Sequence, residues 1–330
     1  MRSWVALVAL AIVGCSQAQP VAEATSAPTT SAPTSSSSPA SSATICRLPI
    51  SVDPADGTGP HGAFIDYPSG RMKVDPQGAG GRYFDHRFAR WLPVDAHSVS
   101  PDESHYAQGG AATDGQPYLR IVDVVSGAER TYNLPRDLFS AIGGTHVFEY
   151  TDDAVYLGVD GEGYIAALWV FNLAGGTTTY VGDISGIGAI DGTTVWRSTL
   201  NAADPNTWSF VPGSPSNQIE RLDLQDGSRK VWLYRPGHLV GVVGVDASHM
   251  PIVADMSDRQ NVELSILTSP TGQVLIVKSS VETWAGYISG VIADSRGIWF
   301  GGGKGFYLFS QTDGVKKVTD QTGTPAGTCA

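Results

Sequence analysis

A recurring pair of short hairpins is the feature that most constrains how this chain folds. From Cys46 onward, short apolar or alternating runs are separated by turn residues every 8 to 12 positions, with no long helical period. Each pair ends in a glycine turn, and the turn glycines at 127, 175, 227, 272 and 314 are 48, 52, 45 and 42 residues apart. Such a period with short strands predicts an all-β repeat fold.

The repeated unit consists of four short strands. The apolar strand before each glycine turn falls at 119–124, 168–173, 219–224, 262–267 and 306–309. A preceding hairpin supplies strands at 106–107, 155–157, 195–196, 251–253 and 298–300. One more copy is expected upstream, from 62–67, 71–74, 83–84 and 91–92. Six copies over residues 46–330 give about 48 residues each, the size of a β-propeller blade, so we expect six blades rather than seven.

The turn that opens one copy resembles a known family. Ser100-Pro101-Asp102 leads into a strand, an apolar strand and a glycine turn, and residues 100–134 resemble the TolB-like and WD40-like repeats of bacterial propellers. The Trp-Asp marker of true WD40 repeats is absent, and Gly-His occurs once instead of recurring with the repeat. The resemblance implies a propeller, in which we expect the tryptophans to be core between neighbouring blades, namely Trp169, Trp196, Trp232 and Trp299.

Two cysteines lie at the two ends of the repeat region. A closed propeller brings its first and last blades together, so Cys46 and Cys329 are expected to be neighbours. Outside the cytoplasm such a pair oxidises. The sequence therefore predicts a Cys46–Cys329 disulfide that clasps the ring.

The N-terminus predicts export and a lipid anchor. A cationic start is followed by an apolar run from Trp4 to Val13, which is short for a membrane span and typical of a secretory signal. Its end, Ile12-Val13-Gly14-Cys15, resembles the lipobox of bacterial lipoproteins. The resemblance implies that residues 1–14 are removed and that Cys15 is lipidated; the alternative is an ordinary signal peptide that happens to contain a cysteine.

A biased segment separates the anchor from the repeats. In residues 20–44, 23 of 25 positions are Pro, Ala, Ser or Thr. Such a segment can bury too little apolar surface to offset the conformational entropy that it would lose on folding. Residues 15–45 are thus expected to be a disordered tether, and 46–330 the propeller.

With 32 acidic against 21 basic side chains and a net charge of -11, the chain is a poor partner for nucleic acid. We expect an extracytoplasmic, membrane-anchored monomer.

Recognisable catalytic motifs are absent from the sequence. There is no GxSxG, HExxH, P-loop or EF-hand pattern. Residues 161–166 match GxGxxA, but a strand-like run follows them, so a loop between strands is expected. Residues 53–57 give only a weak hint of a Ca²⁺ loop, and no cofactor is predicted. The histidines occur singly, and five aspartates (Asp102, Asp153, Asp191, Asp246 and Asp294) fall at turns, where the side chain bonds local backbone.

The predicted binding surface is the propeller face that carries the blade-to-blade loops and the loops between second and third strands. Aromatic and cationic side chains in those loops are typical anchors of a binding surface, although they also fit as caps on the blades. The predicted ligand-binding residues are Trp208, Arg235, His238, Trp284 and Tyr287. We expect a binding or scaffold module for an envelope protein or glycan. The alternative is a metal-dependent, lactonase-like hydrolase or a quinone dehydrogenase-like enzyme with its site at the channel mouth.

Overall fold

The computed structural model describes residues 46–53, 59–136, 145–161, 164–184, 186–201, 216–258, 261–280 and 288–330. These lie in one compact unit, Ala43–Ala330. The predicted signal sequence, Cys15 and nearly all of the tether lie outside the described residues. No helix in the described part of the chain has the length and hydropathy that a membrane crossing requires.

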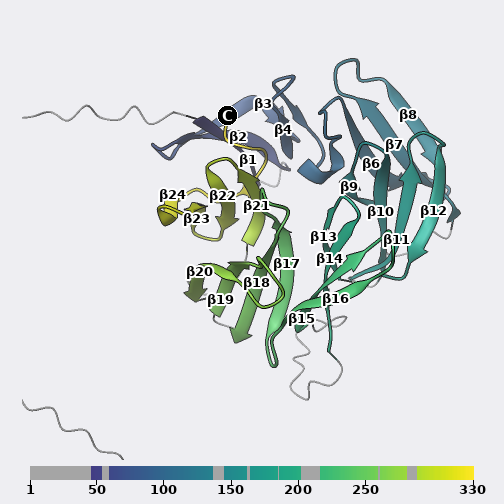
Figure 1. Ribbon diagram of the computed structural model, residues 1–330. Coiled ribbons are helices and arrows are strands. Elements are labelled where there is room, and N and C mark those ends of the chain that lie inside the picture. Colours follow the sequence, from purple (N-terminus) through teal and green to yellow (C-terminus); the bar gives the residue numbers. More distant parts are fainter. Residues whose placement is uncertain are drawn as a thin grey trace, which may run out of the picture. The chain divides into compact units, whose positions relative to one another are not determined.

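Six antiparallel sheets follow one another around a ring (Figure 1). Four of them are meanders of four strands in chain order. The third blade consists of β9 (Thr145–Tyr150), β10 (Ala154–Gly161), β11 (Tyr164–Asn172) and β12 (Thr177–Gly182), and the fourth of β13 (Ile187–Asp191), β14 (Thr194–Thr199), β15 (Gln218–Asp223) and β16 (Arg229–Tyr234). The fifth consists of β17 (Leu239–Val245), β18 (Pro251–Asp258), β19 (Asn261–Ile266) and β20 (Val274–Ser280), and the sixth of β21 (Ile288–Asp294), β22 (Gly297–Gly302), β23 (Gly305–Ser310) and β24 (Gly314–Thr319). The first strands of successive sheets contact one another, so they are the inner strands of the ring. The predicted six-bladed propeller is confirmed.

The second blade has an irregular inner strand. Its regular strands are β6 (His105–Ala111), β7 (Pro117–Asp123) and β8 (Glu129–Asn133). The inner position is taken by the 3-10 turn η1 (Ala96–Ser98), which contacts β9, and by Val99, which bridges to Tyr106. This blade therefore begins near residue 94.

The first blade is completed by the C-terminus. Its order is β25 (Thr324–Pro325), β1 (Cys46–Val52), β2 (His61–Tyr67) and β3 (Arg71–Ala79), so the inner strand comes from the end of the chain. Cys46 and Cys329 form the predicted disulfide, with Cα atoms 5.5 Å apart across 283 residues of sequence. In the other complete blades a hairpin turn joins the first strand to the second. Here the disulfide makes that connection.

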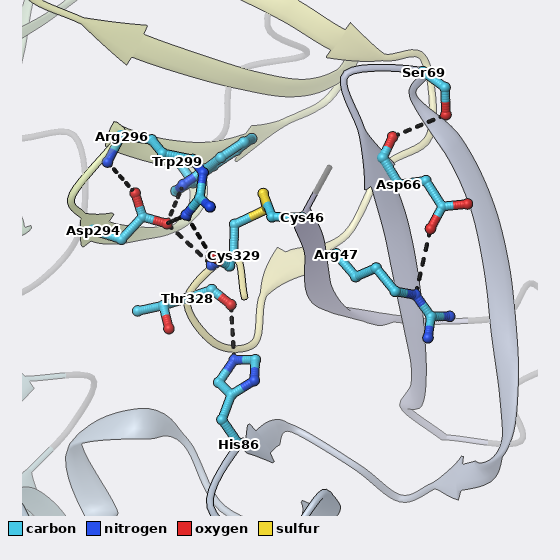
Figure 2. The surroundings of a disulfide bond; sticks show 10 residues. All are labelled: Cys46, Arg47, Asp66, Ser69, His86, Asp294, Arg296, Trp299, Thr328 and Cys329. Atoms are coloured by element: carbon cyan, nitrogen blue, oxygen red, sulfur yellow. Dashed lines mark hydrogen bonds and ion pairs between the residues drawn. A yellow bond between two sulfur atoms is a disulfide. The ribbon is translucent and has the colours of Figure 1, made fainter. Parts of the chain in front are cut away.

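Side chains of the sixth blade, together with His86, hold the same terminus (Figure 2). Asp294 Oδ2 accepts hydrogen bonds from the Cys329 amide (3.0 Å) and from Trp299 Nε1 (2.8 Å). Arg296 Nη1 donates to the Cys329 carbonyl at 2.6 Å, and His86 Nε2 donates to the Thr328 carbonyl at 2.8 Å. The ring closure is therefore a set of directed contacts around the disulfide.

The upstream repeat copy was predicted wrongly in part. Its second half forms a separate hairpin, β4 (Tyr83–Asp85) and β5 (Arg90–Leu92), instead of the third and fourth strands of a blade. Phe84 and Trp91 pack on Phe64 of the first blade, while Leu92 lies in a cluster with Val99 of the second. The hairpin thus fills the junction between these blades, because β25 already occupies the remaining place in the first sheet.

Close packing at this hairpin explains one glycine. A Cβ on Gly62 would overlap the indole ring of Trp91, so only glycine lets β2 and the hairpin approach this closely. Burial matches the predicted core for Trp169, Trp196 and Trp299, and the partly buried Trp232 packs edge-on against Trp196 with ring centroids 4.8 Å apart.

Most predicted turn residues take the expected role. Gly127, Gly227 and Gly314 have positive φ angles, whereas in the Gly175–Gly176 turn it is Gly176 that has one, and Gly272 has none. Asp102, Asp246 and Asp294 each accept a hydrogen bond from a backbone amide two residues later. Asp191 differs, since its carboxylate accepts from the His249 ring of the next blade at 2.9 Å.

Candidate functional site

Histidines mark the start of three inner strands. His97 lies in the inner segment of the second blade, His146 is the second residue of β9, and His238 directly precedes β17. Because the inner strands of a propeller run in the same direction, these positions lie at one end of the ring. This is the end where blade-to-blade connections arrive, and it is the face on which the sequence predicts binding residues.

A polar cavity of about 380 Å³ opens between the second and third blades at this end. The polar side chains on its wall are Arg82, Asp95, His97, Ser98, Gln108, Tyr118, Thr145 and His146. They come from the loop between β3 and β4, from η1 and the connection before it, from β6 and β7, and from the beginning of β9. Hydrogen-bond donors and acceptors from two blades and the loop before β4 thus converge on a space large enough for a small ligand.

The charge state of the cavity follows from its walls. The protein around His97 displaces water from its imidazole, and this desolvation lowers the pKa of the ring. Nearby Asp95 and a hydrogen bond to the Val147 backbone oppose part of the effect. His97 is therefore neutral at pH 7, with one ring nitrogen to donate and one to accept. Arg82 lies 4.0 Å from Asp95, an exposed and weak pair that leaves the guanidinium accessible.

Two of the predicted ligand-binding residues meet at a different junction. Arg235 Nε lies 3.3 Å from Asp255 Oδ2, and His238 Nδ1 donates to Asp255 Oδ1 at 2.6 Å. Asp255 is a buried residue of β18, whereas Arg235 and His238 are about one third exposed. Arg235 also donates through Nη2 to Gln273 Oε1 at 2.8 Å. The Arg235 guanidinium and the His238 imidazole are thus held in fixed orientations by one carboxylate, with part of each surface open to solvent.

The remaining predicted site residues are Trp208, Trp284 and Tyr287, and all three lie outside the described residues. Within the described ranges, His, Cys, Asp and Glu side chains form no group of three or more that could hold a metal ion. In the glycine motif at 161–166, Gly161 ends β10 and Tyr164 begins β11, so the run after the motif is a strand, as expected. Residues 162 and 163 lie outside the described residues.

The opposite end of the ring carries a titratable cluster. Glu149, near the end of β9, has its pKa raised to about 8, first by burial and then by the charge of Asp191. Asp191 ends β13, and His249 lies in the turn after β17. Three successive blades therefore contribute to this cluster, which lies where first strands end and second strands begin.

Sequence reasoning missed the cavity and Glu149 for the same reason. His97 and His146 are 49 residues apart, and each was interpreted as a lone structural histidine. The available signal was their place in the repeat, since both occur shortly before or at the start of an inner strand. Glu149 had no signal, because its unusual environment comes from a different blade.

Similarity to known proteins is confined to solved structures, at low sequence identity. No known protein family matches the sequence, and no curated protein matches it either. Among solved structures the chain is similar to TolB from Acinetobacter baumannii, at 14% identity and a TM-score of 0.46, over 86% of this chain and 66% of that one. An oligogalacturonate lyase in complex with manganese gives 12% identity and 0.46 over 83% and 74%. A putative 6-phosphogluconolactonase from Bacteroides uniformis gives 10% and 0.38 over 83% and 81%. At these identities no function is transferred.

Proposed function

We propose that this chain is an extracytoplasmic binding module, held at the cell envelope by a lipid on Cys15, whose ligand is a glycan or a loop of an envelope protein. The Cys46–Cys329 disulfide supports an oxidising compartment, because such bonds persist outside the cytoplasm. The lipobox and the Pro, Ala, Ser and Thr tether account for attachment at a distance from the membrane.

The observation that carries the proposal is the polar cavity between the second and third blades. Its walls offer neutral imidazole, guanidinium, amide and phenol groups, a set that matches the hydroxyl, carbonyl and acidic groups of sugars and peptides. Arg235 and His238, at the same end of the ring, extend the surface, and Trp208, Trp284 and Tyr287 are proposed to add the aromatic contacts. Aromatic rings supply contact area at low entropic cost.

The test is capture of a partner from envelope extract by immobilised protein, with the partner identified by mass spectrometry. We expect His97→Ala with His146→Ala to weaken capture at least about tenfold, since two wall side chains that bond the ligand are lost. We expect Trp208→Ala with Trp284→Ala to act in the same direction. The matched control is His249→Ala, an exposed histidine at the other end of the ring, which should leave capture unchanged. Unchanged capture by both double variants, with melting temperatures also unchanged, would refute the site.

Metal analysis separates this proposal from the enzyme alternative. A propeller hydrolase or dehydrogenase needs carboxylates from several blades to converge on a metal. If the purified protein retains one calcium per chain after dialysis, the enzyme alternative replaces the binding module. Protein that binds its partner without metal supports the module.

The anchor makes a separate prediction. Cys15→Ser removes the thiol that would carry the lipid, so the variant should move from the membrane fraction into the periplasm or medium. Fractionation with immunodetection measures the shift, and the intact mass of the wild type measures the lipid. A variant that stays wholly in the membrane fraction, together with a wild type of unmodified mass, contradicts lipidation.

A further inference from the structure

The outermost strand of the third blade, β12, differs from the outermost strands of the other five blades. β3, β8, β16, β20 and β24 each contain a lysine, arginine, aspartate or glutamate, and β3 also contains a proline. β12 reads Thr-Thr-Thr-Tyr-Val-Gly and carries no charge, and it ends an uncharged run that extends from residue 163 to residue 182. Charges and prolines on edge strands normally oppose pairing with another chain. This protection is missing from β12.

The free edge of β12 is exposed. β12 pairs with β11 on one side, and no strand in the described parts of the chain pairs with its other side. Thr177 and Thr179 are exposed, and Tyr180 and Val181 retain 46% and 37% of their accessible surface. Backbone donors and acceptors along this edge are therefore accompanied by apolar and hydroxyl side chains, the composition that suits strand addition.

We propose that β12 is a self-association edge, which pairs antiparallel with β12 of a second copy of this chain. The pairing joins two four-stranded blades into one eight-stranded sheet about a two-fold axis. In such a pairing the central residue faces its own equivalent, and the residues on its two sides face each other. A pairing centred on Lys316 or Lys317 of β24, or on Arg229 or Lys230 of β16, would therefore place like charges opposite each other. At β12 no like charges meet, and this favours a second copy as the occupant.

The side chains of β12 are prepared for such a contact. The Tyr180 hydroxyl donates to Asp183 Oδ1 at 2.5 Å, and its ring lies 4.9 Å from that of Trp169. A ring fixed in advance loses little freedom on association. Threonine opposite threonine, tyrosine or valine is a favourable cross-strand pair. Centred on Thr179, the two-fold pairing places Thr179 opposite its own equivalent, Thr178 opposite Tyr180 and Thr177 opposite Val181. Asp183 then lies opposite Gly175.

The association is expected to be weak. Six residues per chain form an interface at the small end of the range for specific complexes, which corresponds to dissociation constants of about 10 µM to 1 mM. This inference replaces the monomer expected from the sequence with a monomer–dimer equilibrium. It does not depend on the proposed ligand site, which lies at the start of the inner strands.

Sedimentation equilibrium of the purified chain, from about 10 µM to about 1 mM, tests the proposal. We expect dimer to increase with concentration in the wild type. Thr179→Lys and Thr179→Glu should each raise the dissociation constant at least about tenfold, because like charges then meet at the edge. An equimolar mixture of the two variants should recover a heterodimer, because opposite charges then face each other. Thr131→Lys on β8, an exposed threonine of a strand that already carries charge, is the matched control and should dimerise as the wild type does.

The net charge makes the lysine variant informative. The chain carries -11, so an added lysine lowers the overall repulsion between copies and would strengthen nonspecific association. Loss of dimer in Thr179→Lys therefore points to the edge itself. A wild type that remains monomeric at about 1 mM overturns the proposal. The proposal is also overturned if both Thr179 variants dimerise as strongly as the wild type, or if their mixture shows no heterodimer.

Discussion

Replacing Cys46 and Cys329 together by serine is expected to lower the free energy of unfolding by up to about 5 kcal/mol, the largest effect of any change considered for this chain. The bond closes a loop of 283 residues and so restricts the unfolded chain, and the chain-entropy model assigns a contribution of this order to so long a loop. The first blade also loses its only covalent link to the inner strand β25. Chemical denaturation of both proteins measures the change, and a reducing agent should reproduce it in the wild type.

The matched control for this prediction is Cys15→Ser, which removes a cysteine but no disulfide. Its denaturation midpoint should equal that of the wild type. Equal midpoints for the wild type and the Cys46, Cys329 double variant would contradict the role of the clasp. In that case the hydrogen bond from the Cys329 amide to Asp294 and the one from Arg296 to the Cys329 carbonyl would be sufficient to hold the terminus.

Stability is expected to fall as the pH rises from about 4.5 to about 8, and Glu149→Gln is expected to remove that part of the fall. Burial and Asp191 raise the pKa of Glu149 from 4.5 to about 8 in the folded chain. Between these values the folded state binds more protons than the unfolded state, so the free energy of unfolding decreases with pH. The full penalty is present above pH 8 and absent below pH 4.5.

The Glu149→Gln variant distinguishes the titration of Glu149 from that of other groups. Glutamine matches the shape of the protonated carboxyl group, so Glu149→Gln should exceed the wild type by about 2 kcal/mol at pH 8.5 and equal it near pH 4. Asp152→Asn, which removes an exposed carboxylate three residues further along, should leave the wild-type pH dependence intact. Denaturation curves at four or five pH values decide the matter, and parallel pH profiles for wild type and Glu149→Gln would contradict the assignment.

Local features of the fold were predictable because their causes are local. An alternating or apolar run between turn residues forms a strand wherever the chain places it, and Gly127 and Gly227 adopt positive φ where the turn requires it. The repeat period then sets the blade count, since each unit has four strands. The pairing of Cys46 with Cys329 follows once the ring is closed, because closure brings the first and last blades together.

The first blade shows where this reasoning stops. Residues 83–85 and 90–92 have the same local pattern as blade strands, yet they form the hairpin between two blades. The difference is made by β25, a two-residue strand more than 230 positions further along the chain that takes the inner place beside β1. Which strand joins a sheet depends on competition among all the segments that can reach it, and a short window of sequence does not contain the competitors.

The periodic features of this protein follow from local sequence: its strands, its turns, its blade number and, once the ring is closed, the Cys46–Cys329 clasp. Which side chains share a site depends on how the blades pack in the folded ring. His97 and His146 line one cavity from two blades, His238 and Arg235 meet on Asp255, and Glu149 acquires its raised pKa from burial and from Asp191. Strand formation is governed by neighbours along the chain, whereas a binding site is governed by neighbours in space, and a propeller draws those from different blades.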